Sequence, residues 1–156
     1  MRFKNFSIWR GRLPHWRADD VRYYVTFRHR RDLDVEERQR LLTALLRPDA
    51  RKWDLLILCV LPGLTELIFS VREQPTGKPY ELSAIVEKAK TKAGREIVKR
   101  TGEKFSPFYA ESYDRIIRDE AELAERWQAI HDSPVTSELV ESPEEWAELW
   151  VNAAPR

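Results

Sequence analysis

The chain is poor in the residue types from which reactive centres are most often built. Among its 156 residues there are one cysteine and three histidines. An intrachain disulfide is therefore excluded, and so is a zinc site made from paired cysteines. The sequence also contains neither a glycine-rich nucleotide loop nor the elbow motif of a serine hydrolase. Cys59 lies within an apolar stretch, which predicts a buried and unreactive thiol.

Long apolar runs are missing as well. No window reaches the ~18 consecutive apolar residues of a membrane span, and the first residues lack the apolar core of a signal peptide. We therefore expect a cytoplasmic protein. A chain of 156 residues suits one domain, which buries roughly 70% of its unfolded surface. We assign residues 1–156 to that domain, with 1–20 as an N-terminal basic and aromatic arm and 132–156 as a C-terminal acidic helical segment.

The formal net charge is only +1, but the charges are unevenly distributed along the chain. Basic residues gather in the N-terminal part and in the stretch 88–104, whereas acidic residues gather from 119 to 148. A nearly neutral total is thus compatible with one strongly basic face, which an anionic polymer such as a nucleic acid would detect. The alternative is a merely solvated surface, since lysine-rich helices are common.

Hydrophobic periodicity predicts an α+β fold. Strands are expected at 22–28, 53–61, 64–72 and about 108–116, and helices at 35–46, 81–100, 119–131 and, last and short, 143 to about 150. The order β-α-β-β-α-β-α indicates a small antiparallel sheet with helices packed against it.

Several motifs are similar to those of one known family, and they follow the same order along the chain as in that family. The apolar strand Asp54–Leu61, the turn Pro62-Gly63 and the strand Leu64–Val71 form a hairpin. It is similar to the signature hairpin of the REP-associated tyrosine transposases, bacterial relatives of the single-tyrosine HUH transposases. Further segments match the family's other motifs: Leu13–Trp16, Tyr23–Arg28, Leu82–Gly102, Glu111–Glu120 and Ala129–Val135. The resemblance implies an HUH-transposase-like fold.

In that family the second strand of the hairpin opens Pro-Asn-His-x-His, and the two histidines hold a divalent cation against the scissile phosphate. A tyrosine on a later helix attacks the phosphorus. Here the histidine positions read Leu64 and Glu66, the tyrosine position reads Ala129, and the motif's asparagine is Ser133. The resemblance therefore implies a degenerate cleavage site. We expect Leu64 to have joined the hydrophobic core.

Few groups remain that could replace the lost ones. Glu66 is a candidate metal ligand, or else it forms a salt bridge across the sheet. Tyr113 and His131 are candidates for rearranged catalytic roles, and Tyr109 is a further tyrosine close to the fourth strand. We expect no cofactor, and Mg²⁺ or Mn²⁺ only if the chain is an active enzyme. His29, which follows a strand amid arginines, is expected on the surface.

The basic and aromatic parts of the family pattern are retained, and they predict DNA binding through phosphate contacts and base stacking. The residues expected to contact DNA are Arg10, Arg12, His15, Trp16, Arg28, Lys90, Arg95, Lys99, Arg115 and Arg118.

The sequence favours a transposase-like protein that binds a hairpin or single-stranded DNA element without cleaving it. A divergent but active transposase is the alternative. A protein-interaction subunit that regulates an intact transposase is a second one, because family members commonly form dimers.

Overall fold

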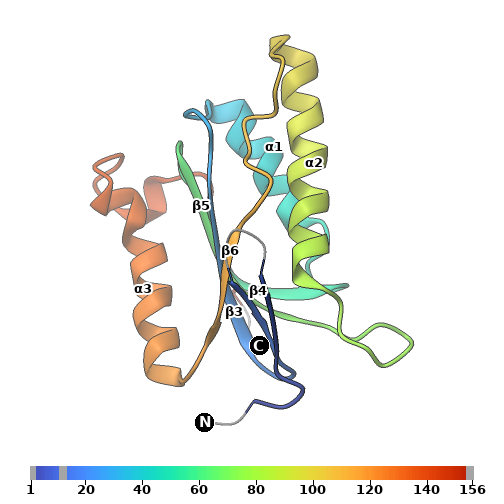
Figure 1. Cartoon of the computed structure of the whole chain (residues 1–156). Helices are drawn as coiled ribbons and strands as arrows, with labels where there is room; N and C mark the ends of the chain where they lie inside the picture. The colour runs from blue at the N-terminus through green and yellow to red at the C-terminus, as the bar shows by residue number, and fades with distance from the viewer. Residues whose placement is uncertain (1–2, 11–13, 154–156) are drawn as a thin grey trace.

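The computed structural model describes residues 3–10 and 14–153. Its centre is a five-stranded antiparallel sheet with the strand order β6-β3-β5-β4-β7. The strands are β3 (Arg22–Arg28), β4 (Trp53–Val60), β5 (Leu64–Val71), β6 (Tyr113–Ile117) and β7 (Leu149–Val151). Helices α1 (Val35–Leu46) and α2 (Leu82–Thr101) lie on one face of the sheet, and α3 (Glu120–Thr136) lies on the other (Figure 1). The expected α+β architecture is confirmed.

Alternation along the strands divides the core into two layers. On β3, Tyr23 and Val25 point into a large cluster that includes residues of α1 and α2, such as Leu41 and Ile97. Tyr24, between them, points to the opposite face and joins a smaller cluster that is closed by Ile130 of α3. The two faces of the sheet therefore have different covers, and within residues 3–10 and 14–153 α3 is the one α-helix that covers the second face.

The helices begin and end where local chemistry dictates. Asp34 accepts a hydrogen bond from the backbone N–H of Glu37 at 2.9 Å, and Glu37 returns one to the Asp34 N–H, which makes a capping box at the start of α1. Helix α2 ends at Gly102, whose φ of 74° is the left-handed conformation that a glycine adopts without strain. The sequence predicted the end of this helix at residue 100, one residue before its observed end at Thr101.

Helix α3 runs five residues further than expected, to Thr136, although Pro134 lies inside it. A proline at this position removes the N–H that would bond to the Ile130 carbonyl. The hydroxyl of Ser133 takes its place and donates to the Ile130 oxygen at 2.7 Å. The helix can therefore continue for one more short stretch without leaving that carbonyl unpaired.

The expected C-terminal helix at 143–150 is wrong. The structure has one 3₁₀ turn, η1 (Pro143–Glu145), and then strand β7, which pairs with β4 at Cys59↔Leu149 and Ile57↔Val151. Glu148, just before β7, forms an ion pair with Arg38 of α1 at 2.5 Å and is 1% exposed. Pairing with a sheet edge and a buried ion pair thus outweigh the local helical signal.

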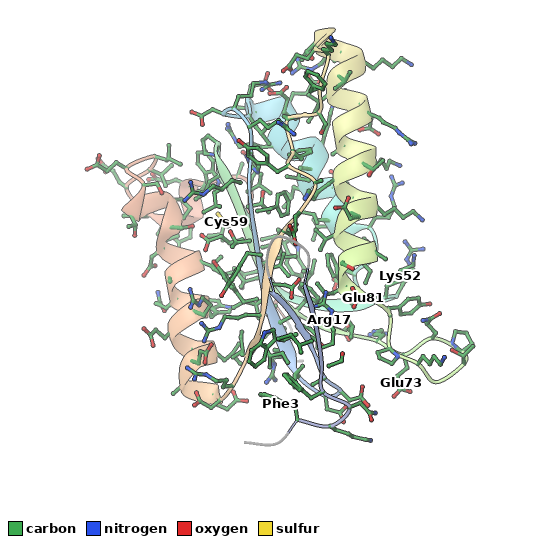
Figure 2. All side chains as sticks on the ribbon, viewed as in Figure 1. Phe3, Arg17, Lys52, Cys59, Glu73 and Glu81 are labelled. Atoms are coloured by element: carbon green, nitrogen blue, oxygen red, sulfur yellow. The ribbon has the colours of Figure 1, made fainter. Side chains whose placement is uncertain are left out.

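The N-terminal arm folds as a second, two-stranded sheet of β1 (Ser7–Arg10) and β2 (Pro14–Arg17). Arg17 anchors it: the guanidinium contacts Asp114 of β6 at 2.7 Å and Glu81 at 2.5 Å. Figure 2 shows Arg17 and Glu81 close together at the start of α2. Burial opposes the charge on Glu81, but its hydrogen bonds with Arg17 and Ser83 lower the pKa of its carboxyl.

No helix among the residues described is long and apolar enough to span a bilayer.

Candidate nucleic-acid interface

The face of the sheet that α3 covers contains the positions of the family's two histidines. Residues directly opposite each other in an antiparallel pair point to the same face. Strand β5 pairs with β3 at Arg28↔Leu64 and Tyr24↔Ile68. Because Tyr24 and Ile68 pack with Ile130 of α3, Leu64 and Glu66 belong to the same face.

Leu64 does not lie in the core. It is half-buried and belongs to neither core cluster. It lines a hollow of about 930 Å³ together with Arg28, Arg30, Tyr109 and Tyr113. The expectation that Leu64 had joined the hydrophobic core is therefore wrong, because α3 covers the middle of this face but leaves the end near the β4–β5 turn open.

Glu66 contacts a tyrosine on the neighbouring strand. The hydroxyl of Tyr24 donates a hydrogen bond of 2.7 Å to Oε2 of Glu66. Burial, and then this hydrogen bond to a carboxylate, raise the pKa of the Tyr24 phenol. The guanidinium of Arg126, from α3, lies 4.6 Å from the centroid of the Tyr24 ring. The salt bridge that the sequence suggested for Glu66 is thus replaced by a hydrogen bond to a neutral phenol.

These residues do not fit a divalent cation. Leu64 offers no ligand atom, and one oxygen of Glu66 is already bound to the Tyr24 hydroxyl. Within residues 3–10 and 14–153 no group of three or more His, Cys, Asp or Glu side chains could hold a metal ion. A cation of the kind that the fold family uses requires several such oxygen or nitrogen ligands.

The candidate catalytic side chains do not form a reactive group. Ala129 is exposed. His131 stacks on Trp127 with ring centroids 5.0 Å apart, and its Nδ1 lies 3.1 Å from Asp132 on its own helix. Tyr113 is 37% exposed, and its ring packs edge-on against the Tyr24 ring, with the ring centroids 6.5 Å apart. Cys59 is fully buried (Figure 2), and burial raises the pKa of its thiol to about 12.

His29 is buried, so the expected surface position is wrong. Its Nδ1 lies 2.7 Å from the Pro62 carbonyl oxygen and its Nε2 lies 2.8 Å from Oγ1 of Thr65. The ring of Phe108 packs edge-on against the imidazole, with the ring centroids 5.5 Å apart. The histidine therefore holds the end of β3 against the turn that precedes Leu64. In this way it fixes the backbone at the open end of the sheet.

Three hollows on the molecule share lining residues. The first lies between the β1–β2 hairpin and β6 and is lined by Trp16, Tyr113, Arg115 and Arg118, among others. The second is the hollow beside Leu64, and Tyr113 lines both. The third has about 550 Å³ and lies against α2, where Arg95 and Lys99 line it. Arg30 and Tyr109 line the second and the third. The second hollow thus adjoins both the first and the third.

The predicted DNA-contacting residues divide into groups on this surface. Arg28, Arg95 and Lys99 are exposed, and in the described part of the chain none of them forms an ion pair. Arg115 and Arg118 both pair with Glu122 of α3. The side chains of Arg10, Arg12 and His15 lie outside what the structure describes. Trp16 is 42% exposed, and it packs edge-on against Phe6 with the ring centroids 5.1 Å apart.

Lys90 differs from the other predicted cations because it is only 3% exposed. Its Nζ lies 3.2 Å from Oγ of Ser112 and 4.8 Å from the centroid of the Phe27 ring. Burial lowers the pKa of this amine. Lys90 is therefore no surface contact; it holds the segment 102–112, which leads into β6, against α2. Figure 1 shows this segment running alongside α2.

Sequence reasoning missed Tyr24 and Arg30 as parts of this site. Period-two alternation puts Tyr24 and Arg28 on one face of β3, but only the strand pairing shows that Glu66 is opposite. Arg30 follows the strand, and its position depends on a backbone bond to Pro107, a residue 77 positions away.

Comparison with solved structures identifies the fold. A REP-associated tyrosine transposase bound to a REP hairpin superposes with a TM-score of 0.67 at 16% sequence identity, covering 92% of this chain and 81% of that chain. A putative transposase from Deinococcus radiodurans R1 gives a TM-score of 0.47 at 14% identity, covering 80% of this chain and 96% of that chain. No protein-family model matches the sequence, and no curated protein sequence does. The chain has the fold of the REP-associated tyrosine transposases.

Proposed function

We propose that this protein binds a hairpin or single-stranded DNA element in the cytoplasm and does not cleave it. The fold supports DNA as the partner, because the solved structure with that fold holds a REP hairpin. The adjoining second and third hollows support it too. Their exposed cations, Arg28, Arg95 and Lys99, are free of carboxylate partners within the described residues and suit phosphate groups.

The hydrogen bond between Tyr24 and Glu66 is the observation that most strongly supports a loss of cleavage. At the place where this fold would hold a cation, one position is leucine and the other carboxylate is bound to a phenol from the next strand. The exposed Ala129 supplies no nucleophile. Removing one member of a catalytic unit usually disables it, and here each member is replaced.

The test incubates the full chain with hairpin-containing oligonucleotides and either Mg²⁺ or Mn²⁺. We expect a shifted protein-DNA complex on a native gel and no covalent adduct on a denaturing gel. A metal-dependent adduct that disappears in Tyr113→Phe would establish the active alternative, because Tyr113 is half-exposed beside Leu64 in the second hollow. If the chain does not bind DNA but binds an intact transposase tightly, the result would instead establish the regulatory alternative.

A further inference from the structure

Lys90 of α2 is a buried lysine that no carboxylate pairs with directly. It is 3% exposed. Its Nζ donates to Oγ of Ser112 over 3.2 Å and to the Ala110 carbonyl over 3.5 Å, distances at or beyond the long end of the usual range for hydrogen bonds. Among the residues that the structure describes, it forms no ion pair. An ammonium group with such weak partners is costly to bury.

Charged groups from several elements act on this amine. Burial has the largest effect and lowers the pKa of Lys90, whereas Glu87 on α2 and Glu111 in the segment 102–112 favour the charged form. Burial also lowers the pKa of His29 at the end of β3, and the charge on Lys90 adds to that effect. At a given pH the folded chain therefore holds more of Lys90 as the neutral amine than the unfolded chain does. The neutral amine is the form that attacks electrophiles.

The same lysine lines the third hollow, and so do the cations Arg30, Arg95 and Lys99. Within residues 3–10 and 14–153 these three cations form no ion pair. The hollow has a volume of about 550 Å³, which is enough for a small molecule. An amine nucleophile and three unpaired positive charges thus border one space.

The other sides of the amine are closed by packing. The centroid of the Phe27 ring lies 4.8 Å from Nζ. The segment 102–112 packs closely on α2, since a Cβ added at Gly94 would lie 2.6 Å from Oγ of Ser106. The hollow is therefore the side from which a reagent can approach Lys90.

This combination fits an acyl phosphate, a small molecule with a phosphate group joined to an acyl carbon. Arginine and lysine side chains bind the phosphate through charge-assisted hydrogen bonds. The acyl carbon next to the phosphate is an electrophile for a neutral amine. A nucleic-acid backbone or inorganic phosphate would bind the same cations, but neither has an acyl carbon for Lys90 to attack.

We propose that Lys90 is a modification site, which an acyl phosphate acylates from the third hollow. Arg95 and Lys99 hold the phosphate while Nζ attacks the acyl carbon. The new C–N bond replaces the bond from the acyl carbon to the phosphate oxygen, inorganic phosphate leaves, and the proton of the amine passes to solvent. The amide that forms is uncharged, so the cation–π contact with Phe27 is lost. The hold of Lys90 on the segment 102–112 is weakened in consequence.

The test incubates the full chain with acetyl phosphate and follows acetylation of single lysines by tandem mass spectrometry. Lys88 and Lys92 are internal references, because they lie one position away on either side along the same helix, exposed and half-buried respectively, and line none of the three hollows. We expect Lys90 to react at least about tenfold faster than either of them, the advantage that one charged hydrogen bond to the phosphate provides. The preference should disappear when the chain is unfolded in guanidinium chloride.

Variants test the role of the cations. Arg95→Gln with Lys99→Gln should slow acetylation of Lys90 by about tenfold or more. Arg47→Gln with Arg51→Gln is the matched control, since it removes the same charge from exposed positions outside the three hollows and should leave the rate unchanged. Acetic anhydride, which is uncharged, should acetylate Lys90 equally fast in the wild type and in both variants. With this reagent the rate at Lys90 should rise at a lower pH in the folded chain than in the unfolded chain, because burial lowers the pKa of the amine.

Three results would overturn the proposal. Slower acetylation of Lys90 than of Lys88 and Lys92 by acetyl phosphate would make Lys90 a purely structural lysine. A preference for Lys90 that persists in the unfolded chain would mean that the local sequence, and not the hollow, determines it. An equal loss of rate with acetyl phosphate and acetic anhydride in Arg95→Gln with Lys99→Gln would mean that the cations do not hold a phosphate, and it would rule out an acyl phosphate as the reagent.

Discussion

The hydroxyl of Thr65 donates its hydrogen to Nε2 of His29 over 2.8 Å. This follows because Nδ1 of the same ring faces the Pro62 carbonyl at 2.7 Å, and a carbonyl can only accept. Nδ1 therefore carries the proton and Nε2 accepts. The imidazole is neutral and both of its nitrogens are satisfied. A second proton on Nε2 would reverse this bond, so that the Thr65 hydroxyl would have to accept it, and would place a charge on a buried ring.

The first prediction concerns pH. Burial lowers the pKa of His29 below its ordinary value of about 6.5. The unfolded chain then binds a proton more readily than the folded one. The stability from neutral His29 is complete above about pH 6.5 and is lost as the pH falls below it. Urea unfolding at pH 7.5 and pH 5.5 should show a larger loss for the wild type than for His29→Asn. An equal loss in both proteins would contradict it.

The second prediction tests the Tyr24–Glu66 bond. A double-mutant cycle with Tyr24→Phe and Glu66→Leu should give a coupling of about 1–3 kcal/mol in the free energy of unfolding, because the acceptor is charged. Tyr23→Phe is the matched control. Its hydroxyl donates to the Ala18 carbonyl at 2.8 Å, and its side chain lies on the opposite face. Tyr23→Phe should show no coupling with Glu66→Leu, and a similar coupling for both tyrosines would refute the pairing.

The third prediction concerns restoring the family's site. In the absence of metal, Leu64→His with Glu66→His should lower the melting temperature, chiefly because Tyr24 loses its charged acceptor. Added Mn²⁺ should raise the melting temperature of this variant and leave that of the wild type unchanged. DNA cleavage should appear only when Ala129→Tyr is added. A double variant that is as stable as the wild type without metal would show that the Tyr24–Glu66 bond contributes little.

The fourth prediction concerns phosphate contacts. Affinity for a hairpin oligonucleotide should fall with salt, with a log-log slope of about −0.7 to −0.9 for each contact. Arg95→Glu with Lys99→Glu should weaken binding and reduce that slope. Arg47→Glu with Arg51→Glu is the control, since both are exposed at the end of α1 and line none of the three hollows. An equal effect of the two pairs would mean that binding follows net charge alone.

Much of the fold was predictable because its signals are local. The strands around Val25 and Ile68, and the helix from Leu82 to Gly102, follow from periodicity and a glycine cap. Strand β7 has three residues and exists only because β4 offers an edge, so no local pattern indicates it. A short element of this kind is decided by tertiary pairing.

The candidate site was less predictable, and Lys90 explains why. Its charge and its place in a lysine-rich stretch predicted exposure, but its side chain turns inward to Ser112 and to the Ala110 carbonyl. Burial of a lysine depends on a partner that sequence spacing does not reveal. By contrast, the residues Leu64 and Glu66, at the positions where the family's motif has histidines, are read directly from the sequence. The exposure of Arg28 and Lys99 was also predictable, because no apolar pattern includes them.

Strand β7 also bears on how two such chains could assemble. An uncovered edge strand offers its free N–H and C=O groups to any other chain. In this fold, Leu149–Val151 occupies the outer side of β4, and Arg17 ties the β1–β2 hairpin to β6 at the opposite edge. A dimer formed by joining two sheets through β4 would first have to peel off β7 and separate the buried Arg38–Glu148 pair. The last strand thus protects the protein against uncontrolled sheet extension.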